Sequence, residues 1–178
     1  MKRLISIFAF FICILNFNST HADNIYQDYF NGNRNYLFCY SSMFAEIENI
    51  VYLDKKSLVV QKYDPPIYTL AVNICSIRRD YGESTTKLQG YSTLYFMYKL
   101  KPRSMYILRN GSWHHLSAVY EDYSDSDIEF VRAGEMAFYI AYKMKFYGDR
   151  DWMNPKTHEI RKSIVNDSQL YLIVDGAI

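Results

Sequence analysis

The chain has 178 residues, with 20 lysines and arginines against 19 aspartates and glutamates, and a formal net charge of +1. This length allows one domain or two small ones, and the near-neutral charge gives no electrostatic reason to expect nucleic-acid binding. Hydrophobic residues make up 49% of the chain and charged residues 22%, so the composition excludes a disordered protein. Tyrosine is the most conspicuous residue, with 18 copies.

The first 22 residues have the three-part layout of a secretory signal peptide. A short positive start precedes an apolar run over residues 4–17, and Thr20 and Ala22 place small residues before a cleavage site ahead of Asp23. A membrane anchor is the alternative, but the run has 14 residues and a span takes roughly 20. We therefore expect cleavage after residue 22 and a secreted, periplasmic or cell-surface protein with no transmembrane span.

Cleavage would leave Cys39 and Cys75 as the only cysteines. An even pair in an exported protein can form a disulfide, if the two Cα atoms come within about 7 Å. Two buried free thiols are the alternative, because cysteine behaves as a small hydrophobe. The sequence leaves both open.

Segments with the pattern of strands dominate the chain after a polar arm at residues 23–35. Two turn signals separate some of these segments. Asp64-Pro65-Pro66 requires a turn, and Asn110-Gly111 is a strong signal for a two-residue hairpin. The segment 67–77 is the clearest strand, because four of its apolar residues fall on one face at period 2, namely Tyr68, Leu70, Val72 and Ile74. In all, strands are expected over residues 36–44, 50–54, 58–63, 67–77, 91–100, 105–109 and 112–121.

One clear helix is expected over residues 134–147, which contain good helix formers and no proline. Met136, Ile140 and Met144 recur at i, i+4 and i+8, which predicts that they form its buried stripe. Gly148 follows as the expected residue just past the helix end.

Two weaker signals follow, a short helix over residues 155–165 and a final strand over residues 170–174. Together these elements predict an α+β fold, with a single antiparallel meandering sheet of five to seven strands and the helix packed on one face. We assign this domain to residues 36–148 and a C-terminal extension to residues 149–178.

The segment YLDKKSL at residues 52–58 resembles the "aromatic, x, Asp, x, x, Ser, Ile/Leu" element of small exported bacterial proteins grouped as surface-adhesin-E-like. In that family a strand ends at the Asp, a tight turn follows, and a new strand starts after the Ser. An Asp carboxylate at a strand end can accept hydrogen bonds from N–H groups two or three residues on. The order of elements over residues 36–147 is also similar, although Phe38 or Tyr40 stands where the family has a tryptophan. The resemblance implies adhesion to host proteins.

Motifs that carry chemistry are few. His114 and His115 are adjacent, so on a strand they would point to opposite faces and would not bind one ion together. The acidic stretch over residues 122–129 lacks the spacing and the glycine of an EF-hand loop. The sequence contains neither a GxSxG nucleophile elbow nor a phosphate-binding loop. We therefore predict no catalytic residue, no metal site and no cofactor.

The tyrosines give the only positive indication of a site. Tyr91, Thr93 and Tyr95 would share one face of a strand, and tyrosine is well suited to interfaces because it combines apolar area with a polar tip. Packing beneath the helix is the alternative for this face. We expect an exported, non-catalytic binding or adhesion-type module with a protein or cell-envelope partner. An exported hydrolase with unidentified catalytic residues is the alternative function.

Overall fold

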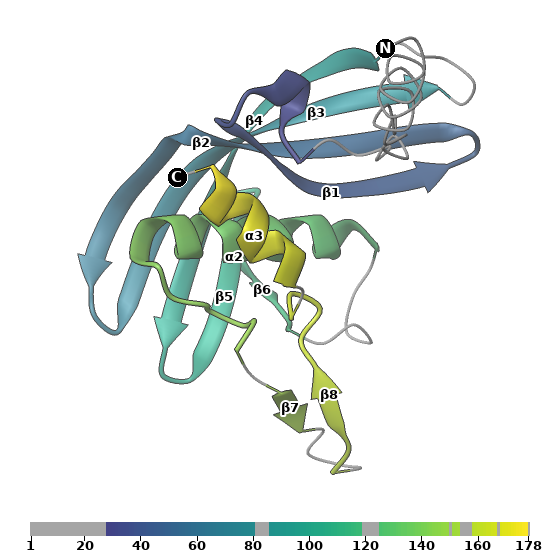
Figure 1. Cartoon of the computed structure of the whole chain (residues 1–178). Helices are drawn as coiled ribbons and strands as arrows, with labels where there is room; N and C mark the ends of the chain where they lie inside the picture. Colours follow the sequence, from purple (N-terminus) through teal and green to yellow (C-terminus); the bar gives the residue numbers. More distant parts are fainter. Residues whose placement is uncertain are drawn as a thin grey trace, which may run out of the picture.

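The computed structural model describes residues 28–80, 86–118, 125–149, 151–153, 158–166 and 168–177. Six strands form one antiparallel sheet in the order β1-β2-β3-β4-β5-β6, so every strand pairs with its neighbour in sequence (Figure 1). The predicted α+β meander is therefore confirmed. The elements are η1 (Phe30–Gly32), β1 (Tyr36–Phe44), β2 (Ile47–Asp64), β3 (Ile67–Asp80), β4 (Thr86–Leu100), β5 (Arg103–Arg109), β6 (Ser112–Leu116), α2 (Asp125–Tyr142), β7 (Asp151–Met153), β8 (Ile160–Lys162) and α3 (Ser168–Gly176).

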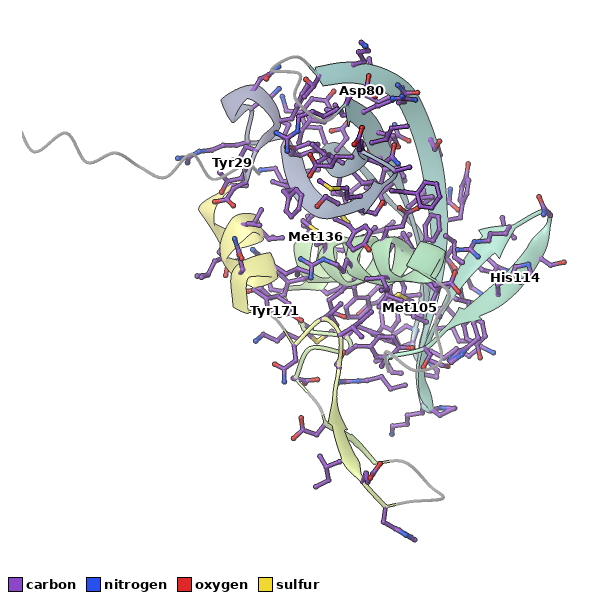
Figure 2. All side chains as sticks on the ribbon, turned by 90° about the vertical axis from the view of Figure 1, so that its right-hand side faces the viewer. Tyr29, Asp80, Met105, His114, Met136 and Tyr171 are labelled. Carbon is purple, nitrogen blue, oxygen red and sulfur yellow. The ribbon has the colours of Figure 1, made fainter. Side chains whose placement is uncertain are left out.

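Helix α2 packs on one face of this sheet, and the long strands bend around it (Figure 1). The inward residues of β3 are those that the alternation predicted, Tyr68, Leu70, Val72 and Ile74, and all are buried. Helix and sheet approach closely at Gly134, where a Cβ atom would collide with Met105 Sδ. Met105 and Met136 are both fully buried in the middle of the molecule (Figure 2). Because the long strands bend around α2, the opposite face of the sheet is convex; we call it the outer face.

Helix α3 completes the same core. The apolar run over residues 170–174 is helical and not a strand, and Leu170, Ile173 and Val174 are buried in the main cluster with α2 and β1. Short apolar runs fit a strand or a buried helix equally well, because neither shows a polar face. The C-terminal segment thus contributes to the main core. The predicted short helix is also wrong where it is described, because residues 160–162 form strand β8.

The predicted limits of the main helix are wrong. It spans residues 125–142, and Lys143 closes it in the left-handed conformation with φ 54°, donating its N–H to the Tyr139 carbonyl at 2.8 Å. Met136 is fully buried and Ile140 partly so, but Met144 lies past the end of the helix and is 46% exposed. The predicted stripe fails because α2 is covered on two sides, by the sheet and by α3, and is buried continuously from Ala133 to Phe138.

Strand β2 is continuous where two strands were predicted. Lys56 N–H donates to Asp54 Oδ1 at 3.0 Å, which confirms the expected hydrogen bond two residues on. The strand does not end there, because Ser57 Oγ donates to the Asp54 carbonyl and accepts from Asn73 N–H, each at 2.7 Å. The serine replaces a missing ladder bond, so the segment is a bulge within one strand.

Other strand limits differ by a few residues. Strands β3 and β4 extend into the predicted polar loop at 78–90, and β6 ends at Leu116. Asn110 and Gly111 both have positive φ, as their hairpin turn requires. The predicted signal peptide lies outside the described residues. Neither helix in the described ranges has both the length and the apolar character needed to cross a bilayer.

Candidate functional site

Tyr91, Thr93 and Tyr95 lie on the outer face of β4. They point away from α2 because Leu94 and Phe96, which alternate with them, are buried in the core beneath the helix. Tyr91 is 58% exposed, Thr93 is exposed, and Tyr95 is half-buried. Packing of these residues beneath the helix, the alternative left open by the sequence, does not occur.

The strand register extends this face across β5 and β6. Met97 is paired with Tyr106, and Tyr106 with His115, whose ring centroid lies 5.4 Å away at an interplanar angle of 67°. In the next row Leu108 is paired with Trp113, which is 40% exposed. No helix among the described residues packs over these side chains, and Tyr91 is hydrogen-bonded to Tyr36 at the start of β1. We call the following set the outer aromatic face: Tyr91, Thr93, Tyr95, Met97, Lys99, Tyr106, Leu108, Trp113 and His115.

The part of the outer face formed by β1–β3 is covered. Ile50, Tyr52, Cys75 and Ile77 form a second, smaller apolar cluster there, and Phe30 of η1 packs on it with its ring 5.4 Å from that of Tyr52. At the end of this cluster the buried Glu48 carboxylate forms an ion pair with the partly exposed Arg79. The two halves therefore differ: η1 packs on the first, whereas no helix among the described residues packs on the second.

Cys39 and Cys75 are free thiols and lie in different clusters, Cys39 in the main core and Cys75 in the second one. Strand β2 separates their strands, and two strand spacings of about 4.8 Å exceed the reach of a disulfide. The bridge considered from the sequence is thus absent in this structure. Burial raises the pKa of Cys39 to about 12 and also raises that of Cys75, which keeps both thiols protonated and poorly nucleophilic.

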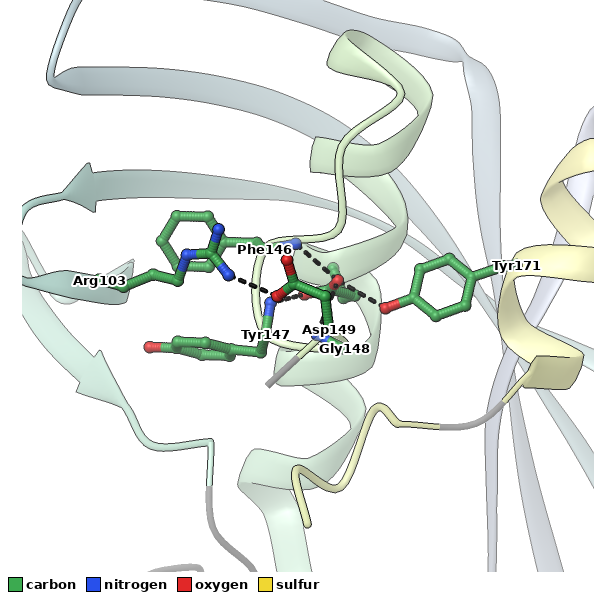
Figure 3. A network of polar contacts seen from close by, with 7 residues as sticks. Arg103, Phe146, Tyr147, Gly148, Asp149 and Tyr171 are labelled. Atoms are coloured by element: carbon green, nitrogen blue, oxygen red, sulfur yellow. Dashed lines mark hydrogen bonds and ion pairs between the residues drawn. The ribbon is translucent and has the colours of Figure 1, made fainter. Parts of the chain in front are cut away.

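A carboxylate that the sequence analysis did not single out lies at the centre of α2. Glu135 is fully buried, and its oxygens accept hydrogen bonds from four donors (Figure 3). These are the backbone N–H groups of Phe146 at 2.7 Å, Tyr147 at 2.8 Å and Gly148 at 3.3 Å, and the hydroxyl of Tyr171 at 2.7 Å. Burial raises the pKa of Glu135, and the four hydrogen bonds oppose that shift.

The Glu135 contacts join three parts of the chain, which are α2, the segment after it and α3. Tyr147 accepts from Met105 N–H at 2.7 Å and donates to the Leu116 carbonyl at 2.9 Å, which ties the segment after α2 to β5 and β6. Beside it, Arg103 pairs with Asp149 at 2.5 Å (Figure 3). Because its oxygens are occupied by these donors, Glu135 holds the fold together rather than exchanging protons with a substrate. A single acid within the apolar stretch GEMAFYIAY was the available sequence signal.

The histidines do not form a metal site with each other. His114 is paired with Ile107 and His115 with Tyr106, so the two side chains point to opposite faces. Within the described ranges, no three side chains of His, Cys, Asp or Glu are grouped so that they could hold a metal ion.

Comparisons of the chain with protein-family models, with curated proteins and with solved structures gave no match. The likeness of residues 52–58 to surface-adhesin-E-like proteins therefore stays a prediction from the sequence.

Proposed function

We propose that the protein is an exported, non-catalytic binding module of adhesion type, and that the outer aromatic face is its contact surface. The observation that carries this proposal is the exposure of large aromatic side chains on one open sheet face, with Tyr91 58% and Trp113 40% exposed. Scattered exposed apolar residues are normal, but several that share one face indicate an interaction surface.

The chemistry of the face suits a macromolecular partner. Tyrosine, tryptophan and methionine are enriched at the centres of protein interfaces, and tyrosine rings offer contact area at a low entropic cost. The face is convex because the strands bend around α2, whereas small ligands are usually enclosed in concave pockets. A protein or cell-envelope surface is therefore the partner that this geometry favours. No specific observation among the described residues favours the alternative, an exported hydrolase.

The test uses two variants. One combines Tyr91→Ala and Tyr95→Ala, the other carries Trp113→Ala alone, and each is compared with the wild-type protein. Both side-chain sets lie outside the main core, so we expect the free energy of unfolding to change by less than about 1.5 kcal/mol. Retention of partners from cell-surface and host-protein extracts should fall at least about tenfold, because aromatic anchors dominate interface energies.

Phe44→Ala is the matched control, because Phe44 is also an exposed aromatic residue, 80% exposed at the β1–β2 hairpin, but lies off the outer aromatic face. It should leave retention unchanged. Retention that is equal for all variants would disprove the proposed surface. Turnover of ester, peptide or glycoside substrates that is lost with one substitution would disprove the non-catalytic function.

A further inference from the structure

Lys99 places a positive charge within the outer aromatic face. Its ammonium group lies 4.9 Å from the centroid of the Tyr106 ring, a cation–π contact, and the side chain is half-buried. Its neighbours across the sheet, Ile67 and Ser104, are uncharged. Among the described residues no carboxylate forms an ion pair with it.

Two carboxylates of β2 on the same face, one in the row of Lys99 and one farther along the sheet, already have partners. Asp64 pairs with Lys62 at 3.0 Å, and Asp54 accepts the Lys56 N–H within the β2 bulge. Within the described ranges the fold therefore supplies no counterion for Lys99.

Any partner that covers Tyr106 also covers Lys99, because the two side chains are in contact. Burial of a charge without a counterion is strongly unfavourable, so buried charges in proteins are paired. An apolar partner surface alone would be penalised at this position, and a partner with a carboxylate there would gain an ion pair in a partly desolvated place.

We infer that the outer aromatic face binds an acidic protein segment, and that a carboxylate of this segment pairs with Lys99. This inference rests on the proposed function and adds the chemistry of the partner to it. A protein segment fits better than a free anion, since Met97 and Tyr106 beside Lys99, and Trp113 farther along the same face, are typical of the apolar centre of a protein interface.

The experiment uses a photo-crosslinking probe, p-benzoylphenylalanine, in place of Trp113 in the full chain, produced in the cells that export it. The exposed indole position lies on the same face as Lys99 and accepts an aromatic substitute. Adducts are quantified with Lys99 unchanged and with Lys99→Glu, Lys99→Met or Lys99→Arg. Lys56→Glu is the control, because Lys56 is exposed and lies in the β2 bulge. Circular dichroism spectra and urea unfolding check that each variant folds.

We expect Lys99→Glu and Lys99→Met to lower the adduct yield at least about tenfold, and Lys99→Arg and Lys56→Glu to retain it. The crosslinked peptide should contain an Asp or Glu whose replacement by Lys restores the yield with Lys99→Glu. Lys99→Met keeps the test valid if the Glu variant fails to fold.

The outcomes separate this inference from the proposed function. An adduct whose yield does not depend on the charge at position 99, or an adduct with a glycan or lipid, overturns the inference and leaves the face as a binding surface. The absence of any adduct in every folded variant overturns the proposed function, and the inference with it.

Discussion

At the scale of single residues, the buried Glu135 carboxylate requires a particular set of hydrogen-bond donors around it. Three consecutive N–H groups and the Tyr171 hydroxyl supply the hydrogen bonds that water would otherwise provide. Gly148 is required beside it, because a Cβ atom at that position would collide with the Tyr171 hydroxyl. The carboxylate therefore fixes the path of the chain between α2 and the tail, and α3 packs against that path.

Tyr171→Phe should lower the free energy of unfolding by about 1–3 kcal/mol, because it removes one donor from a buried charged acceptor and changes little else. Tyr63→Phe is the control: Tyr63 is 66% exposed, and its loss of a hydroxyl should cost less than about 0.5 kcal/mol. Urea unfolding of both variants measures the difference. Equal losses would show that the Tyr171 hydroxyl does not support Glu135 in solution.

The two cysteines give a second prediction at this scale. Both are buried, and the pKa of each thiol is raised by burial, so iodoacetamide at about pH 8 should alkylate neither in the native protein. In urea both should react rapidly, since an unfolded thiol has a pKa near 8.5. Peptide mapping reads each site separately. Recovery of a peptide pair joined through Cys39 and Cys75 would contradict the free thiols of this structure.

At the scale of elements, the strands were predictable and the helices were less so. Period-2 alternation predicted the buried inner face of β3, because Tyr68, Leu70, Val72 and Ile74 form one regular apolar row. The set of buried residues in α2 was not predictable from a single apolar stripe, because the sheet buries one side of this helix and α3 buries a second side. That second side depends on a contact between distant segments, since Glu135 and Tyr171 are 36 residues apart. The apolar run of α3 also fits the pattern of a strand.

Met136→Ala and Met144→Ala test the corrected helix with the same chemical change. Met136 is fully buried, so its truncation should cost about 2–5 kcal/mol. Met144 lies past the end of α2 and is half exposed, so its truncation should cost less than about 1 kcal/mol. Urea unfolding midpoints give the comparison. A larger loss for Met144 would restore the predicted stripe and contradict the observed end of the helix at Tyr142.

At the scale of the whole molecule, the sequence indicated which residues share a face but not whether that face is open. Tyr91, Thr93 and Tyr95 would alternate in the same way beneath a helix. Their exposure follows from α2 and α3 both packing against the other side of the sheet. Tyr106, Trp113 and Lys99 join the same surface through strand pairing, and this register depends on contacts between strands that the linear pattern does not contain.

The tyrosines also predict how the whole molecule responds to alkali. Burial raises the pKa of the Tyr98, Tyr147 and Tyr171 phenols above the ordinary value of 10.0. A group whose pKa is higher in the folded state stabilises the fold fully below its unfolded pKa and loses that contribution as the pH rises above it. The contribution of these phenols to the free energy of unfolding should therefore stay constant up to about pH 9. Above about pH 10 each of these phenols should lower the free energy of unfolding by up to about 1.4 kcal/mol per pH unit.

Urea unfolding at about pH 8 and about pH 11, with tyrosinate absorbance followed in parallel, measures this loss. The buried phenols of Tyr98, Tyr147 and Tyr171 should ionise only as the protein unfolds. Tyr171→Phe should unfold with a shallower dependence on pH, because one of the three phenols is absent. A free energy of unfolding that is the same at both pH values would mean that water reaches these rings in the native protein, which the packing of Tyr98 against Phe138 at 4.8 Å does not allow.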